Sequence, residues 1–550
     1  MNAEAGAEAI VDPLEGPAYG IDGRVVTMND DHDVLASATL WIERGVIRAI
    51  TASDGARPAG FDAAPLVRTG GTIYPGMIEL HNHLPYNILR MWDVPELYGN
   101  RSQWGRHDQY RRLVSGPMNV LGKTAGFIEA IVRYVEVKAL VAGVTTSQGI
   151  ALFSNANTRR YHRGLVRNVE DTDDAELPEA DTRVADVDDA ASFLTRLQRG
   201  KTVILHLAEG VDDGARRHFQ ALQTQDGRWA ISDRLIGIHA AGLTEADMAT
   251  FASHGGAMVW SPSSNLMLYG GTAAVAAARR EGVTVALGSD WSPTGSKSLL
   301  RELQVARAVA DARDLAITDR DLVDMVTRNP ARALRWDGML GSLGPGRRAD
   351  LLVLSGKQGD PYQRLLQATE RSVVLVAVNG VIRYGQPRYL PAGAEQFAVD
   401  GSRRALFLDQ ASVDPVIAEV TFAEAVTRLE DGLSRLPELA AALEAETGPV
   451  MEVGGREGVP PVTVFGIERA GARWVLELED EEPDGTTTRP ELGVAEIAPV
   501  PVPESAEAAA PLSEILEPLE LDPLTVIDDR GYARRLRSQR NIPTDVAAAL

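Results

Sequence analysis

The sequence contains no cysteine among its 550 residues. Disulfide bonds, thiolate nucleophiles and cysteine-ligated zinc are therefore excluded, and any bound metal must use nitrogen and oxygen ligands. Positive charge is also scarce, because 55 lysines and arginines stand against 77 aspartates and glutamates and leave a net charge of -22. We expect no nucleic-acid partner, since proteins that bind nucleic acid normally present a clustered basic surface.

Long apolar runs are missing as well. The first twenty residues carry acidic side chains and lack the apolar stretch of a signal peptide, and no later run approaches the ~18 apolar residues of a membrane span. We therefore expect a cytoplasmic protein with no membrane partner. Hydrophobic residues make up 44% of the chain, which is typical of globular proteins, and the length predicts two or three domains.

Strand and helix patterns alternate through the middle of the chain, which predicts parallel βαβ units and an α/β fold. We expect a (β/α)8 TIM-like barrel whose fourth strand, the weakest of the eight, lies at 183–187. Helical patterns at 125–143 and 298–313 would belong to its outer ring. The other seven predicted strands are 77–83, 142–149, 164–170, 202–210, 234–240, 256–262 and 284–290.

Short β-rich segments with glycine and asparagine turns flank the predicted barrel on both sides. We expect residues 1–74 and 337–391 to form one composite β-sandwich around a barrel domain at 75–336. Residues 392–550 would be an appended α+β region of unknown role, with a helix at 422–446, a hairpin at 462–480 and a Pro/Ala/Glu linker at 498–514. This region could cover the barrel mouth, extend the sandwich or form a subunit contact.

The triplet His81-Asn82-His83 follows the first predicted barrel strand. Successive side chains of a strand alternate between its two faces, so both imidazoles project together while Asn82 points away. Two histidines on one face make half a metal site. A pair of exposed loop histidines is the simpler alternative, and the motif alone does not decide between them.

Three further strands end in ionisable residues. His206 ends one apolar strand and His239 the next, while Asp290 ends the last one, and Glu209 lies in the loop after His206. Each of them could be structural on its own. Barrel enzymes, however, collect their active-site residues from several strand ends, so together these residues predict one shared site.

With these stretches in view, the sequence resembles the amidohydrolase superfamily, in particular its cytosine deaminase and chlorohydrolase (atrazine/triazine hydrolase) branch. The similar stretches occur in order between about residues 20 and 390, which is more specific than any single motif. They are PGMIELHNH, LHLAEG, GIHAAGL, WSPSSNLMLYG, ALGSDW, MVTRNPARAL and LGSLGPGRRADLLVL.

The resemblance implies which residues would bind the metal and which would carry protons. It makes His81, His83, His206 and Asp290 the ligands of a divalent ion. Glu209 and His239 would be the proton shuttle and the group that stabilises the transition state, with Asp290 also taking part in catalysis. One ion is expected, because no lysine ends the predicted fourth strand where dinuclear relatives carry a carboxylated lysine. Zinc is the first choice, with iron and manganese as alternatives.

Several residues of the barrel loops are candidates for contact with a small-molecule substrate. A solvated loop is the alternative for His107, and Lys297 would favour an anionic substrate if its ammonium group pointed inward. The six candidates are Trp104, His107, Asn265, Tyr269, Trp291 and Lys297.

We therefore expect a metal-dependent hydrolase that acts on a carbon–nitrogen bond of a non-peptide amide, cyclic amide or amidine by means of activated water. The alternatives are a deaminase or chlorohydrolase of a heteroaromatic ring, and a non-catalytic scaffold of the same fold. A scaffold has no need for unpaired polar groups at strand ends. The oligomeric state is left open, with a homo-oligomer as one arrangement.

Overall fold

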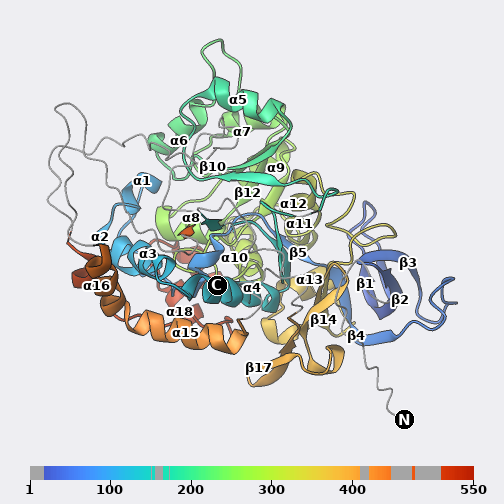
Figure 1. Cartoon of the computed structure of the whole chain (residues 1–550). Helices are drawn as coiled ribbons and strands as arrows, with labels where there is room; N and C mark the ends of the chain where they lie inside the picture. Colours follow the sequence, from blue (N-terminus) through green and yellow to red (C-terminus); the bar gives the residue numbers. More distant parts are fainter. Residues whose placement is uncertain are drawn as a thin grey trace, which may run out of the picture.

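The computed structural model describes residues 18–149, 152–154, 165–172, 174–408, 420–447, 474–476 and 510–550. Figure 1 shows parallel strands and their helices at the centre, a large sheet to one side, and the C-terminal helices along the lower edge. The predicted linker up to residue 509 and most of the predicted hairpin lie outside the described residues.

Eight parallel strands form the central part of the fold. Every strand pairs in parallel with its neighbour along the chain within two sheets, as expected for successive βαβ units. The first sheet contains β5 (Met77–Glu79), β6 (Val144–Ser147) and β8 (Arg167–Asn168). The second contains β9 (Ala180–Arg183), β10 (Thr202–Leu207), β11 (Leu235–His239), β12 (Ala257–Trp260) and β13 (Val285–Leu287).

The two parallel sheets adjoin each other at both of their edges. Asn82, after β5, forms a parallel bridge with Asp290, after β13. At the other edge the backbone N–H of Ala180 donates to the carbonyl of Val169. The fold is thus α/β with a TIM-barrel-like arrangement of strands.

The fourth strand begins three residues before the predicted one. It is β9, and it pairs with β10 through Ala180–Arg183. The strand ends at Arg183, whose guanidinium donates to the carbonyls of Ala185 and Asp186 where the chain bends away. The other seven predicted strands each contain an observed one.

Helices follow most of these strands, as Figure 1 shows. Their N-termini are capped by side chains that accept backbone N–H groups: Thr244 and Asp247 form a capping box on α7, and Ser298 caps α10. The helices are α4 (Phe127–Val141), α5 (Ala190–Gln198), α6 (Asp213–Gln220), α7 (Glu245–Ser253), α8 (Pro262–Tyr269), α9 (Val275–Arg280), α10 (Leu299–Ala312), α11 (Asp319–Asp324) and α12 (Arg328–Ala333).

The two flanks of the barrel region share one nine-stranded sheet, in which β4 and β14 pair antiparallel. The turn Asn379-Gly380 between β15 and β16 has positive φ at both residues, the geometry for which Asn-Gly is favoured in hairpins. The strands are β1 (Tyr19–Val26), β2 (Val34–Glu43), β3 (Val46–Ala52), β4 (Leu66–Pro75), β14 (Leu351–Ser355), β15 (Val373–Val378), β16 (Val381–Gly385), β17 (Glu395–Val399) and β18 (Ser402–Leu406).

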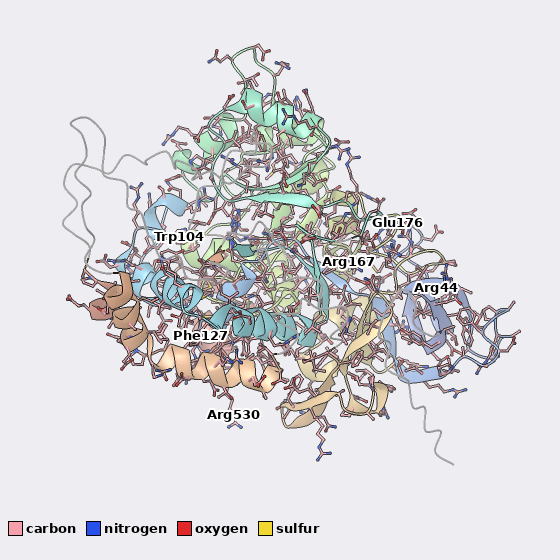
Figure 2. The ribbon with its side chains drawn as sticks, viewed as in Figure 1. Arg44, Trp104, Phe127, Arg167, Glu176 and Arg530 are labelled. Carbon is pink, nitrogen blue, oxygen red and sulfur yellow. The ribbon has the colours of Figure 1, made fainter. Side chains whose placement is uncertain are left out.

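Arg167 connects the parallel strands to this sheet (Figure 2). It projects from β8, and its guanidinium binds the carboxylate of Asp350 beside β14 and the side chain of Asn379. The pair with Asp350 is almost fully buried. The position of the nine-stranded sheet relative to the barrel region is thereby fixed through a charged contact.

The loop after β5 is long and contains short helices. It passes beside the C-terminal ends of the parallel strands, where barrel enzymes carry their active sites. Its elements are η1 (Leu84–Ile88), α1 (Arg101–Trp104), α2 (Asp108–Tyr110), η2 (Arg111–Ser115) and α3 (Gly116–Lys123).

The region after Leu390 has two visible roles. β17 and β18 extend the nine-stranded sheet, and α15 (Phe422–Ser434) packs on α4, where Phe422 stacks on Tyr134. α16 (Leu436–Thr447) continues toward α3, as Figure 1 shows. The last described segment holds α17 (Leu512–Ile515), α18 (Tyr532–Arg537) and α19 (Thr544–Ala549).

The remaining described elements are β7 (Leu152–Ser154), which pairs with β19 (Trp474–Leu476), and α13 (Pro361–Leu366), η4 (Glu370–Ser372) and η5 (Pro387–Tyr389). Among the described residues, no helix has both the length and the apolar character needed to cross a membrane.

Candidate metal centre and active site

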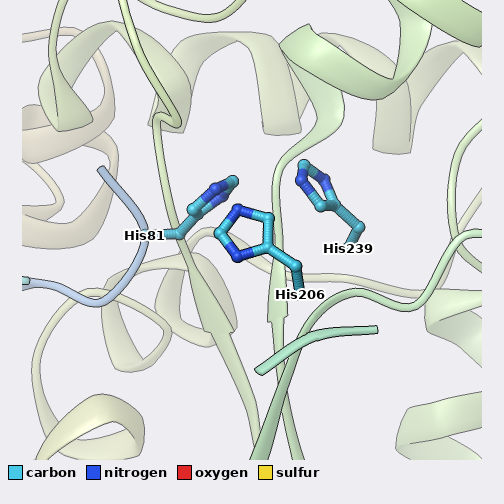
Figure 3. Close-up of side chains that lie close together, drawn as sticks. All are labelled: His81, His206 and His239. Carbon is cyan, nitrogen blue, oxygen red and sulfur yellow. The ribbon is translucent and has the colours of Figure 1, made fainter. Parts of the chain in front are cut away.

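The histidines predicted to share a site do lie together. His81 follows β5, His206 lies in β10 and His239 ends β11, and Figure 3 shows their three rings close to one another. The ring centres of His81 lie 5.5 Å from His83, 5.0 Å from His206 and 4.6 Å from His239. All four side chains and that of Asp290 are buried.

The strand geometry of the His81-Asn82-His83 triplet is as predicted. The two imidazoles lie on the same side of the chain, edge to face. Asn82 points elsewhere, since its Nδ2 donates to Ser289 Oγ and its Oδ1 accepts from Asn87. Alternation along the strand therefore accounts for the pairing.

Three distances between predicted ligand atoms are close to those expected around one tetrahedral metal ion. His83 Nε2 lies 3.1 Å from His206 Nε2, and Asp290 Oδ1 lies 3.3 Å from His81 Nε2 and 3.6 Å from His83 Nε2. Atoms about 2.0–2.1 Å from one zinc ion at tetrahedral angles would be ~3.3 Å apart. Two groups of three could hold an ion, one of His81, His206 and His239 and one of His81, His83 and Asp290.

The protonation of these groups also suits a cation. Burial lowers the pKa of His81 and His206 well below the ordinary range, and the neighbouring histidines lower it further. Neutral imidazole is the form that binds metal. His81 Nδ1 contacts Ser261 Oγ at 2.7 Å, whereas its buried Nε2 has no hydrogen-bond partner among the described residues. A metal ion would satisfy this atom.

The backbone at three strand ends adopts an uncommon conformation. Ala208, His239 and Asp290 have φ of 47°, 64° and 65°, in the left-handed region that residues other than glycine rarely adopt. Such residues cluster at active sites because they direct side chains in ways that regular strands do not. This turn places Glu209 beyond the end of β10, in the loop position that the sequence predicts.

Glu209 is held by a chain of buried hydrogen bonds. Tyr269 Oη donates to Glu209 Oε1 at 2.8 Å and accepts from Trp104 Nε1 at 2.8 Å. The second carboxylate oxygen, Oε2, lies 3.6 Å from His239 Nε2 and 3.5 Å from a guanidinium nitrogen of Arg101. One oxygen of Glu209 is thus fixed while the other faces the histidine cluster.

Asn265 fixes the orientation of His239. Its Nδ2 donates to Thr272 Oγ1, so its Oδ1 is the atom that lies 2.9 Å from His239 Nδ1 and accepts the proton there. His239 Nε2 is then directed toward Glu209. A carboxylate and an imidazole next to the ligand group can move protons to and from a substrate.

Aromatic rings form a wall next to the predicted metal ligands. The Trp291 ring lies 5.4 Å from His83 and 6.0 Å from Trp104. Tyr86 and Tyr110 also contact it, at 5.2 Å and 6.2 Å. Stacked or edge-on contacts of this kind suit a flat, unsaturated ligand.

Two of the six predicted substrate-contact residues lie elsewhere. Lys297 is buried, and its ammonium group contacts the carboxylates of Asp522 and Asp529 at 2.6 Å and 3.2 Å. Carboxylates from the end of the chain therefore balance its charge, and a contact with an anionic substrate stays a prediction. His107 is partly exposed, and its Nδ1 accepts from the backbone N–H of Gln109.

The predicted site residues do not include Arg101, Tyr86 or Ser261. Ser261 precedes α8, inside the stretch that the family resemblance covers, and Tyr86 lies three residues after His83, so both positions offered a signal. Arg101 had none, because it lies in a long loop and reaches Glu209 only through the fold.

One family model matches the part of the chain that contains His206, His239 and Asp290. The model described as "Amidohydrolase family" matches residues 195–385. A 5-methylthioadenosine/S-adenosylhomocysteine deaminase from Moorella thermoacetica is 24% identical over 437 residues, 71% of this chain and 96% of that protein. A namesake from Syntrophus aciditrophicus is 32% identical over 161 residues, but the match spans only 27% of this chain and 36% of that protein.

Solved structures show the same fold. An adenosine deaminase from Xanthomonas campestris with bound zinc superposes with a TM-score of 0.56 at 20% identity, covering 76% of this chain and 98% of that one. A variant of atrazine chlorohydrolase from Arthrobacter aurescens, complexed with zinc and atraton, has a TM-score of 0.54 at 19% identity and covers 68% and 97%. The chain is thus similar to the amidohydrolase family over residues 195–385, and it shares the fold of deaminases and of atrazine chlorohydrolase.

Proposed function

We propose that this protein is a zinc-dependent hydrolase that removes an amino group from a heteroaromatic ring. Hydrolysis of carbon–nitrogen bonds follows from its family and from its deaminase relatives. The ring is the finer part of the proposal. It is carried by one observation, the aromatic wall of Trp291, Trp104 and Tyr110 that adjoins His83.

The proposed ligands are His81, His83, His206 and Asp290, three neutral imidazoles and one carboxylate. A zinc ion in such a site acts as a Lewis acid and lowers the pKa of bound water from 15.7 toward ~7. Asp290 Oδ1 lies near both His81 and His83, from where it can accept a proton from the attacking water.

Glu209 is proposed as the proton carrier between water and the leaving amine. The hydrogen bond from Tyr269 holds one oxygen, and the other, which lies near His239 and Arg101, would exchange protons with the substrate. General acid–base catalysis of this kind contributes about 10²- to 10⁴-fold to a rate. His239 would stabilise the negative charge that develops on the ring. Its Nδ1 donates to Asn265, which leaves Nε2 directed toward Glu209.

We further infer that the eight parallel strands close into one (β/α)8 barrel and that the flanks form a composite sandwich. The Asn82–Asp290 bridge and the hydrogen bond from Ala180 to Val169 support closure. The domain bounds 1–74, 75–336, 337–391 and 392–550, a cytoplasmic location and a homo-oligomeric state stay predictions.

A panel of substrates tests the proposed reaction. An aminopurine nucleoside, an amino-s-triazine, a chloro-s-triazine and a cyclic amide would be incubated with the zinc-loaded enzyme, and ammonia, chloride and carboxylate would be measured. We expect ammonia from a ring amine. Chloride release alone would favour the chlorohydrolase alternative, for which the likeness to atrazine chlorohydrolase speaks, and carboxylate release alone would contradict a ring substrate.

The variant Glu209→Gln tests the proton carrier with the same panel. We expect it to retain zinc and to lose most of kcat. The matched control is Glu245→Gln, because Glu245 is exposed and pairs with Arg280 on the surface. Full turnover by the Glu209 variant would refute its role.

A further inference from the structure

The last forty-one residues of the chain, 510–550, lie against the active-site loop, and we call them the C-terminal arm. The backbone N–H of Asp522 donates to the carbonyl of Ile88, and Gln539 exchanges hydrogen bonds with Trp92 and Val94. The side chain of Asn541 donates to two carbonyls, one in the loop and one in α8. The arm therefore holds the loop after β5 against the barrel helices.

Within the arm, Asp522 is buried between two lysines. Its carboxylate lies 2.6 Å from Lys138 Nζ, on α4, and 2.6 Å from Lys297 Nζ, at the start of α10. All three side chains are at most 3% exposed. A buried ammonium group is costly unless a carboxylate compensates it. Burial alone would lower the pKa of Lys138 strongly, and Asp522 is the group that opposes this most, leaving it at about 8.

Lys138 connects this carboxylate to the two loops that carry metal ligands. Its Nζ donates to the carbonyl of Asn87 at 2.7 Å and to Ser292 Oγ at 3.0 Å, in addition to Asp522. These contacts use the three protons of the ammonium group. Asn87 follows His83 in the chain, and Ser292 follows Asp290, so one buried cation joins both loops.

A second set of hydrogen bonds brings this connection next to the histidines. Asn87 Oδ1 accepts from the backbone N–H of Ser292 at 2.7 Å, and Asn87 Nδ2 donates to Asn82 Oδ1 at 2.9 Å. Asn82 lies between His81 and His83. A cavity of only about 10 Å³ adjoins Asn82, Asn87, Lys138 and Lys297, which is room for one water at most. The ammonium groups of Lys138 and Lys297 therefore bind protein groups in the interior of the site.

We propose that Asp522 is a positioning residue of the metal centre, acting through Lys138 and Asn87 on the loops that carry His83 and Asp290. The inference rests on the proposed zinc site but not on the identity of the substrate. The C-terminal arm would thus affect the chemistry of the barrel, although it contacts a loop, at Trp92, that lies 430 positions before Asp522 in the chain.

Zinc affinity of Asp522→Asn is the direct test. The full-length protein would be titrated against a chelator that competes for zinc, and kcat and KM would be measured on any substrate found with the panel above. Partners beyond the ligands typically change metal affinity or activity 10- to 100-fold, and we expect a loss of about that size in zinc affinity, with kcat falling more than KM rises. Asp522→Glu should restore part of it.

The matched control is Glu520→Gln in the same arm, because Glu520 is exposed and pairs with Arg90 at the surface. It should bind zinc as the wild type does. An Asp522→Asn protein that folds cooperatively and keeps zinc affinity within twofold of wild type overturns the proposal. A wild-type protein without stoichiometric zinc would instead contradict the proposed function.

A second variant keeps the inference testable if Asp522→Asn does not fold. Ser292→Ala removes one acceptor of Lys138 and leaves the arm unchanged. We expect a smaller loss of zinc affinity than in Asp522→Asn. Where Asp522→Asn does fold, the double variant should show a combined loss below the product of the two, since residues in one hydrogen-bond network do not act independently. Wild-type zinc affinity in Ser292→Ala would overturn the proposed connection.

Discussion

Replacing Tyr269 by phenylalanine tests how Glu209 is held. The hydroxyl group is buried and makes two hydrogen bonds, one to Glu209 Oε1 and one from Trp104 Nε1. Burial raises the pKa of Tyr269 well above its ordinary value of 10, and the charge of Glu209 raises it further. The hydroxyl therefore stays protonated and donates to the carboxylate throughout the working range of pH.

The expected size of the effect follows from these two bonds. A hydrogen bond to a charged group contributes about 1.5–3 kcal/mol. If Glu209 must keep its orientation in the transition state, Tyr269→Phe lowers kcat about 10- to 150-fold, at 1.36 kcal/mol for each factor of ten. The indole N–H of Trp104 also loses its acceptor, which costs about 1–3 kcal/mol of stability. KM should change less than kcat.

Steady-state kinetics of Tyr269→Phe, Glu209→Gln and the double variant separate orientation from general damage. Residues that act as one unit show non-additive effects, so the double variant should be no slower than Glu209→Gln alone. Wild-type kcat in Tyr269→Phe would refute the reasoning, and so would losses that multiply in the double variant.

Three further predictions concern the metal and the interior of the site. A chelator should abolish turnover and lower the melting temperature, with both restored by added zinc, because a ligand that binds only the folded state stabilises it; an unchanged melting temperature would contradict the metal site. Gly149→Ala should lose zinc, since its Cβ would lie 1.5 Å from the carbonyl oxygen of Asn82 at a φ of +80°, whereas Gly338→Ala, with nothing within 4 Å, should bind zinc normally in the same metal analysis. Burial raises the pKa of Glu302 from 4.5 to about 7, so its protonated form adds stability that is complete below pH 4.5 and is lost as pH rises through 7. The melting temperature of Glu302→Gln, measured across this pH range, should lack that fall. An equal dependence of melting temperature on pH in the wild type and the variant would contradict the prediction.

The strand ends and their histidines could be predicted from the sequence because their signals are local. An apolar run that leads to His206 or Asp290 predicts a strand ending in an ionisable residue, and this prediction needs no information from distant parts of the chain. Alternation along a strand places His81 and His83 on the same face. β9 is different. It is four residues long and contains Asp181, Thr182 and Arg183, so hydrophobicity gave little indication of where it begins.

Contacts between distant segments could not be predicted in the same way. Lys297 directly precedes α10 and lies near the strand end that carries Asp290, which favoured a role in binding substrate. Its partners, Asp522 and Asp529, come more than 220 residues later, in a region whose position no local pattern indicates. The link from Trp104 through Tyr269 to Glu209 likewise spans three segments, and no local pattern in any of them indicates that their side chains are hydrogen-bonded to one another.

The number of metal ions also follows from where the lysines lie. The family resemblance implies that a dinuclear site would use a carboxylated lysine at the end of the fourth strand, and β9 contains no lysine. Lys201 is exposed, and its ammonium group pairs with Asp181 of β9 at 2.5 Å. The two buried lysines, Lys138 and Lys297, are bound to the carboxylate of Asp522, and carboxylation would replace that attraction with repulsion between two negative groups. The charges inside the barrel therefore favour a single ion held by imidazoles and one carboxylate.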